Sequence, residues 1–177
     1  MLPQLIVLLG PIAVGKSTVG RLLENRFRSR FLSPEEFFLR HYGTVENYRN
    51  HRDSAYKCFE LEVRQVLANA SCPVIIEEIG LTAPARHLLQ RLRADYVTLF
   101  VGVDADEQTC LSRLAERGTE QNFPATPSML IASRLRFETE VLPHFDLAFT
   151  VRNENAQDIN LTSPFSHLLQ RRSSNSQ

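Results

Sequence analysis

The sequence predicts an α/β fold in which helices cover both faces of a parallel β-sheet, giving a three-layer sandwich. Residues 5–9 form a short apolar run of the kind found in buried strands, and a glycine-rich turn and helical periodicity follow at once. Further short apolar runs alternate with segments of helical spacing, which is typical of repeated strand–helix units. The 177 residues, 43% of them hydrophobic, suffice for the core of a single domain.

The turn after the first strand fits the phosphate-loop pattern G-x-x-x-x-G-K-[ST]. Glycines at positions 10 and 15 let the backbone wrap around a phosphate where a Cβ would block it. Lys16 is expected to reach the β- and γ-phosphates of ATP, and the Ser17 hydroxyl to bind Mg²⁺. The alternative is a glycine-rich turn with a chance lysine. We predict nucleotide contacts from Gly10, Pro11, Ile12, Ala13, Val14, Gly15, Lys16, Ser17 and Thr18.

A second, weaker strand is expected at residues 31–32, followed directly by a helix. Ser33 and Glu36 have the spacing of a capping box, and Pro34 suits the first helical position. Gly43 is expected to end this helix. Ser33 is thereby explained as a helix cap, with a role at magnesium as the alternative.

A long helix is predicted from about residue 53 to residue 69, and a buried strand at residues 74–76. The strand leads into two adjacent acids, Glu77 and Glu78. A carboxylate at this place can hold Mg²⁺ through water or orient a nucleophile, and we predict Glu77 as a metal ligand. Equally, both acids can be solvated residues at a strand end.

The second half of the chain continues the alternation of strands and helices. Residues 118–128, with glycine, two prolines and polar residues, are expected to form a mobile lid. Residues 1–170 then form one domain, and residues 171–177 a flexible tail. In chain order, we expect a helix from residue 82 to about 94, a strand at 96–103, a helix opened by a capping box at 104–107 and running to about 117, a helix at 129–142, a strand at 147–151, and a short helix at 163–170.

Composition limits the partners. The chain has 20 basic and 20 acidic residues and a formal net charge of +0, so no overall field favours nucleic acid or an anionic membrane. The first apolar run is too short to cross a bilayer.

Three cysteines without a C-x-x-C pair favour a reducing, cytoplasmic location. The histidines show no metal-ligand spacing, and no G-x-S-x-G elbow is present. We expect a monomer or weak dimer that acts on a small molecule.

The chain resembles P-loop small-molecule kinases, the group that includes shikimate kinases and nucleoside monophosphate kinases. Residues 10–23, GPIAVGKSTVGRLL, are very similar to the opening of shikimate kinases. Residues 31–35, FLSPE, stand at the family's F-x-D-x-D run, Gly43 at its glycine, and residues 56–60, YKCFE, at its F-R-x-x-E segment. The resemblance implies a five-stranded sheet of order 2-3-1-4-5, a substrate region between the second strand and the long helix, and a lid that closes over ATP.

This chain departs from the family at the substrate side. Ser33 and Glu35 stand in place of two aspartates, and Lys57 stands where an arginine would grip a substrate carboxylate. The family's glycine triplet is replaced, and only Gly80 is left of it. The resemblance implies Glu35 as the base that accepts the proton of a substrate hydroxyl, although a first-turn acid favoured by the helix dipole explains Glu35 as well. We predict acceptor contacts from Glu35, Lys57, Glu78, Gly80 and Arg134.

Transfer of a phosphoryl group needs positive charge around the transferring group, so arginines next to the lid are candidates. Four flank it: Arg113, Arg117, Arg134 and Arg136. We predict Arg117 and Arg134 as catalytic residues together with Lys16 and Glu35. The alternative for any one of them is a solvated position on a helix exterior.

These observations predict an ATP- and Mg²⁺-dependent kinase that moves the γ-phosphoryl group to a hydroxyl of a small polar molecule, with shikimate the nearest guess from the resemblance. Two alternatives stay open. One is a nucleoside monophosphate kinase, and the other is a nucleotide-binding relative without turnover.

Overall fold

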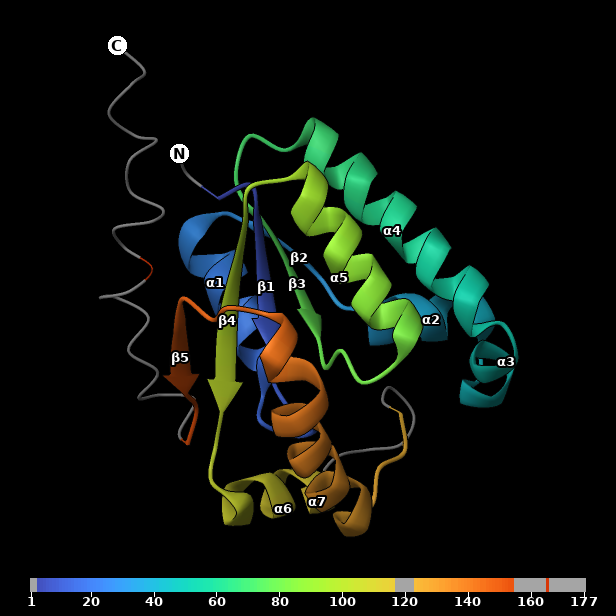
Figure 1. Cartoon of the computed structure of the whole chain (residues 1–177), viewed down its shortest axis with the longest axis vertical. Helices are drawn as coiled ribbons and strands as arrows, with labels where there is room; N and C mark the ends of the chain where they lie inside the picture. Colours follow the sequence, from blue (N-terminus) through green and yellow to red (C-terminus); the bar gives the residue numbers. More distant parts are fainter. Residues whose placement is uncertain (1–2, 117–122, 155–164, 166–177) are drawn as a thin grey trace.

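The computed structural model describes residues 3–116, residues 123–154 and Phe165, and it shows one five-stranded sheet (Figure 1). Every pairing in the sheet is parallel, and the strand order is β2-β3-β1-β4-β5. The fold class and the strand order expected from the sequence are therefore confirmed. The strands are β1 (Leu5–Leu9), β2 (Arg30–Leu32), β3 (Val74–Glu78), β4 (Thr98–Asp104) and β5 (Phe149–Arg152).

Side chains of β1 alternate between two hydrophobic cores, because successive residues of a strand point to opposite faces of the sheet. Leu5, Val7 and Leu9 belong to the core under α4 and α5. Ile6 and Leu8 belong to the core under α1 and α6. The central strand thus joins both helical layers, as a three-layer sandwich requires (Figure 1).

The helices begin where the sequence places caps. Ser33, Thr82 and Thr126 each accept a hydrogen bond from the backbone amide three residues on. The helices are α1 (Lys16–Phe27), α2 (Pro34–Tyr42), α3 (Val45–Asn50), α4 (Arg52–Asn69), α5 (Ala83–Asp95), α6 (Glu107–Glu116) and α7 (Pro127–Arg136), and α7 continues into a π-helical turn (Phe137–Val141) and a 3-10 turn (Leu142–His144).

The structure corrects several expected boundaries. The short helix α3 was not predicted; Thr44 caps it by accepting from the Asn47 amide. The cap of α6 is Asp106, which accepts from the Thr109 amide, rather than a box that begins at Asp104. Glu77 and Glu78 lie within β3 rather than after it, and β5 begins at Phe149 rather than at residue 147.

Parts of the expected lid and carboxyl terminus lie outside the described residues. These are positions 118–122 of the lid region and, apart from Phe165, the closing helix and the tail. Phe165 is fully buried and packs edge-on against Phe149. No helix within residues 3–116 or 123–154 combines the length and the hydrophobicity that crossing a membrane requires.

The strand register brings the candidate chemistry to one edge of the sheet. Leu9, the last residue of β1, pairs with Glu78 of β3 on one side and with Gly102 of β4 on the other. Because all strands run parallel, the phosphate loop after β1 opens beside the two acids that end β3.

Candidate functional site

The phosphate loop has glycine at positions 10 and 15 because the surrounding atoms leave no room there for a side chain. A Cβ on Gly10 would lie 2.3 Å from the Val103 carbonyl oxygen of β4. Gly15 has φ of +85°, and a Cβ there would lie 2.1 Å from Nδ2 of Asn153. Neither position accepts a side chain without displacing its neighbours, so the tight path of the loop depends on both glycines.

The interior of the loop offers hydrogen-bond donors. Within the described part of the chain, the amides of Ala13, Val14 and Gly15 donate to no protein acceptor. The Ile12 amide donates to Ser133 Oγ of α7 at 3.3 Å. Lys16 Nζ folds back onto the carbonyl oxygens of Gly10 at 2.9 Å and Pro11 at 2.7 Å. Amides without protein acceptors beside an ammonium group and a helix start form an anion-binding cradle.

Asn153 and Arg113 brace the outer side of this loop. The buried Asn153 side chain donates to the carbonyls of Val14 at 2.9 Å and Gly15 at 3.2 Å. Arg113 donates to Val14 O at 3.2 Å and to Asn153 O at 2.7 Å. Sequence reasoning missed Asn153, and the only available signal was a polar residue directly after the last strand.

Replacing Asn153 by alanine is expected to loosen the loop, because the carbonyl groups of Val14 and Gly15 each lose one of their donors. We expect a loss of about 1–3 kcal/mol in the free energy of unfolding and weaker binding of ATP analogues. Urea denaturation and calorimetry measure the two effects. The control is Asn25→Ala on the exposed face of α1; equal effects from both variants would show that Asn153 does not brace the loop.

Glu77 faces the first helical turn after the loop. The Ser17 hydroxyl donates to its carboxylate, at 2.9 Å from Oε1 and 2.8 Å from Oε2. Burial raises the pKa of the Glu77 carboxyl, while the charge of Lys16 and hydrogen bonds from Ser33 and Ser17 act to lower it. A hydroxyl and a carboxylate in contact beside a phosphate cradle suit Mg²⁺, which proteins bind with one or two carboxylates plus phosphate oxygens.

Nothing in the described ranges suggests a larger protein-only metal centre: they contain no group of three or more His, Cys, Asp or Glu that could hold a metal ion.

Glu78 is fixed by the turn that follows β3. Its Oε1 accepts from the amides of Ile79 at 2.8 Å and Gly80 at 3.3 Å, and its Oε2 accepts from the Tyr56 hydroxyl at 3.1 Å. Burial raises the pKa of this carboxyl. Glu78 lies on the cavity wall as expected, yet its bonds show a carboxylate that shapes the turn.

Gly80 is a turn residue rather than a cavity residue. It has φ of +79°, and a Cβ there would meet Val141 at 2.9 Å. It is buried and does not line the cavity where the acceptor contact was expected. The left-handed backbone conformation explains why glycine stands here.

A cavity of about 630 Å³ opens between the phosphate loop and the segment from α2 to α4. Glu35 lines it and accepts a hydrogen bond from the Phe123 amide. Phe38, Tyr48 and Tyr56 form an aromatic wall, in which the rings of Phe38 and Tyr48 stack at 4.4 Å. A cavity of this kind accommodates a small molecule, with Glu35 and Glu77 close to its phosphate-loop end.

Lys57 does not reach this cavity. It is exposed on α4, whereas its neighbour Tyr56 points inward and lines the cavity. Successive helical residues are rotated by about 100°, so the side chain after an inward residue faces away. The cations on this side are Arg49 and Arg52, from the α3–α4 junction, which sequence reasoning missed.

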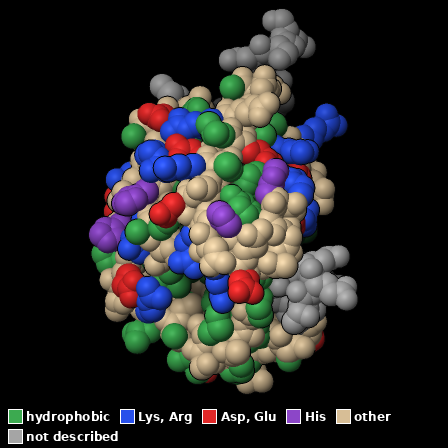
Figure 2. All heavy atoms as spheres, turned by 90° about the vertical axis from the view of Figure 1, so that its right-hand side faces the viewer, with side chains coloured by type: hydrophobic (Ala, Val, Ile, Leu, Met, Phe, Trp, Pro, Cys, Tyr) green, Lys and Arg blue, Asp and Glu red, His purple; other side chains and the backbone are tan. Residues whose placement is uncertain are grey.

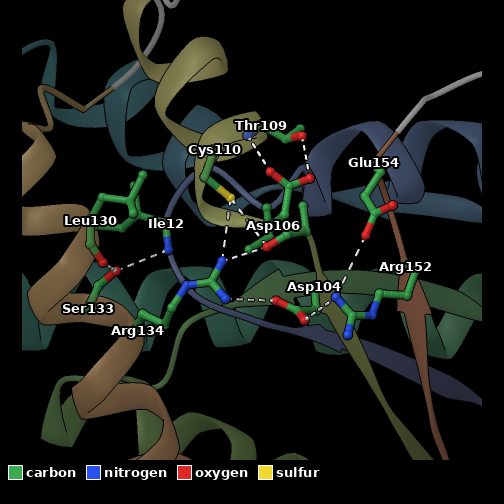
Figure 3. Close-up of polar contacts among 12 residues, drawn as sticks. Ile12, Asp104, Asp106, Thr109, Cys110, Leu130, Ser133, Arg134, Arg152 and Glu154 are labelled. Atoms are coloured by element: carbon green, nitrogen blue, oxygen red, sulfur yellow. Dashed lines mark hydrogen bonds and ion pairs between the residues drawn. The ribbon is translucent and has the colours of Figure 1, made fainter.

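The arginines near the lid are distributed differently from the prediction. Arg117 lies outside the described residues. Arg134 is held away from the cavity by Asp104 Oδ1 at 3.2 Å, the Ala105 carbonyl at 2.6 Å and Cys110 Sγ at 3.6 Å (Figure 3). Arg113 and Arg136 line the cavity instead. Arg134 thus connects α7 to the end of β4, and the structure gives it no contact with the predicted acceptor region.

The model of a family described as "AAA domain" matches residues 5–139. A search of the curated proteins found no significant match.

Several solved structures share the fold. A proposed kinase from Chloroflexus aurantiacus has a TM-score of 0.70 at 18% identity, over 100% of both chains. A gluconokinase from Sinorhizobium meliloti 1021 has a TM-score of 0.62 at 19% identity, over 99% of both chains. A shikimate kinase from Acinetobacter baumannii, in complex with shikimate, has a TM-score of 0.56 at 22% identity, over 85% of this chain and 83% of that one. At these identities, the likeness shows a P-loop kinase fold.

Proposed function

The chain belongs to the AAA domain family, whose model covers residues 5–139, and from this premise we propose that it is a kinase that uses ATP and Mg²⁺ to phosphorylate a hydroxyl group of a small molecule. The observation that carries the proposal is the position of the phosphate cradle at one end of the cavity. Lys16, Glu35 and Glu77 all line that cavity. A phosphate donor and an alcohol can therefore meet in one cavity.

The residues of the cradle fit a nucleotide with its magnesium ion. The amides of residues 13–15 would hold the phosphates, and Lys16 would turn from its present carbonyl partners to the β- and γ-phosphate oxygens. Ser17 and Glu77 would hold Mg²⁺, which supplies positive charge to the transferring group when bound. Arg113 lines the cavity beside the loop and adds a second protein cation there.

Glu35 would act on the acceptor. Its carboxylate would take the proton of the acceptor hydroxyl as the oxygen forms a bond to the γ-phosphorus and the bond to the bridging oxygen of ADP breaks. The proton then resides on Glu35, and ADP is the leaving group. The Phe123 amide, which donates to Glu35, links this base to the segment that follows residues 117–122.

Measurement of ADP release from ATP in the presence of a panel of acceptors tests the proposal. The panel contains shikimate, gluconate and nucleoside monophosphates, because the fold is shared with kinases of hydroxy acids and the resemblance also covers nucleotide acceptors. A rate with one acceptor far above the ATPase rate with water supports a kinase. Tight nucleotide binding without transfer to any acceptor would favour a nucleotide-binding protein without turnover.

Substitution Glu35→Gln is expected to lower kcat by about 10²-fold, because the amide cannot accept the hydroxyl proton. The KM for ATP should stay unchanged, since Glu35 lies on the acceptor side. The matched control is Glu36→Gln, one residue further on the exposed face of α2. Unchanged kcat in Glu35→Gln would remove Glu35 as the base.

A further inference from the structure

A second hollow adjoins the acceptor cavity at the junction of α3 and α4. It has a volume of about 430 Å³ and is lined by residues 49–54 and Pro84. Arg49 and Arg52 line both spaces. Figure 2 faces the side of the molecule that carries α3 and α4, and shows basic, acidic and histidine side chains mixed over it. The acceptor cavity therefore continues outward past two arginines.

In the described part of the chain, these two arginines lack a carboxylate partner of the kind that Arg136, another arginine of the cavity wall, has. Neither Arg49 nor Arg52 forms an ion pair with any residue that the structure describes, whereas Arg136 pairs with Glu140 at 2.7 Å. Nε of Arg52 is buried and has no hydrogen-bond partner among the described residues. The guanidinium also forms a side-chain hydrogen bond with Tyr48, and its buried Nε–H group leaves one donor that an anion in the cavity can satisfy.

The surroundings of Arg52 carry both signs of charge, since Asp53 also lines the outer hollow. Its guanidinium lies 5.9 Å from the centre of the Tyr48 ring, which holds it at the cavity wall. No side chain caps the amino terminus of α4, where residues 52–54 line the outer hollow. Glu78, an acid that lines the acceptor cavity, already accepts hydrogen bonds from the Tyr56 hydroxyl and two backbone amides. An anionic group with planar oxygens matches paired guanidinium donors.

We propose that Arg49 and Arg52 form an anion subsite between the acceptor cavity and the outer hollow. The acceptor is then an elongated alcohol, with its reacting hydroxyl beside Glu35 and a phosphate or carboxylate group at its far end. Its middle lies along the aromatic wall of Phe38 and Tyr48. This inference rests on the proposed function, because that function places the hydroxyl end.

The test uses the full chain saturated with Mg²⁺ and a non-hydrolysable ATP analogue, so that the phosphate cradle is occupied. Three probes of similar size are titrated in: phenyl phosphate, phenylacetate and benzyl alcohol. Binding is followed by the NMR signal of the Arg52 Nε–H group, which is assigned by its loss in Arg52→Gln. We expect both anions to bind at least about 10-fold more tightly than benzyl alcohol, and the stronger of the two identifies the anionic group.

Variants separate the subsite from general charge effects. Arg49→Gln, followed by the backbone signals of residues 49–54, is expected to remove the preference for the anions. Arg26→Gln, on the exposed face of α1, is expected to keep it. Equal affinity for all three probes, or an anion preference that survives in the Arg49→Gln/Arg52→Gln double variant, would overturn the subsite.

Binding of the ATP analogue is measured separately from binding of the three probes, so that the two proposals can fail independently. A chain that does not bind the ATP analogue contradicts the proposed function. A chain that binds the analogue but does not discriminate between the probes contradicts the anion subsite alone.

Discussion

Replacing Lys16 by alanine is expected to reduce turnover by about 10³-fold or more. The ammonium group is the one side-chain cation that projects from within the phosphate loop, where Nζ contacts the carbonyls of Gly10 and Pro11. Under the proposed function, negative charge develops on the oxygens of the transferring group in the transition state, and Lys16 would stabilise it. Coupled measurement of ADP release with the best acceptor of the panel gives kcat and both KM values.

Lys57→Ala is the matched control for this loss. It removes the same side chain from the exposed face of α4, outside the cavity, so kcat and both KM values should stay unchanged. A raised KM for the acceptor in Lys57→Ala would show that Lys57 contacts the acceptor. That result would contradict its position on the exposed face of α4, outside the cavity. Full activity of the Lys16 variant would contradict the proposed kinase activity.

Glu77→Gln is expected to reduce Mg²⁺-dependent turnover by about 10³-fold, because a neutral amide replaces the carboxylate that faces Ser17 at 2.8 Å. The loss should be accompanied by a higher Mg²⁺ concentration for half-maximal rate, which a structural role alone would not produce. Glu138→Gln, at an exposed position, serves as the control. An unchanged magnesium requirement in Glu77→Gln would remove Glu77 from the metal site.

The same substitution is expected to stabilise the nucleotide-free protein at neutral pH. Burial raises the pKa of the Glu77 carboxyl in the folded state, so the folded protein binds this proton more tightly than the unfolded chain does. The resulting stabilisation is present below the unfolded pKa and is lost as the pH rises through the folded pKa. The Glu77→Gln variant should therefore melt above the wild type near pH 8 and approach it near pH 4. Equal melting temperatures across this range would show that the buried charge carries no cost.

The pattern of the sequence predicted much of the fold. Residues 5–9 were expected as a strand and form β1 with those bounds. The capping residue Ser33 and the terminating Gly43 bound α2 as expected. These features depend on local physics, since periodicity, caps and glycine conformations act within a few residues. The strand order came from the resemblance, which covers the same arrangement of strands and helices.

The candidate site was predicted only in part. The phosphate-loop residues and Glu77 were expected where they are found, because a motif and a strand end locate them. Lys57 was expected on the acceptor side but is exposed outside the cavity, since a match of residues 56–60 to a family segment does not determine which side of α4 faces the cavity. Tyr56 occupies that side, and its burial rotates Lys57 outward.

By itself, the sequence determined the phosphate loop, the alternation of strands and helices, and the acids at the end of β3, because each follows from neighbouring residues. Only the tertiary structure decided that Asn153 supports the loop from a position 138 residues away from Gly15, and that Arg49 and Arg52 face the acceptor cavity. These contacts join elements distant in the chain. Their geometry depends on how the helices rotate and pack against the sheet, which no local pattern specifies.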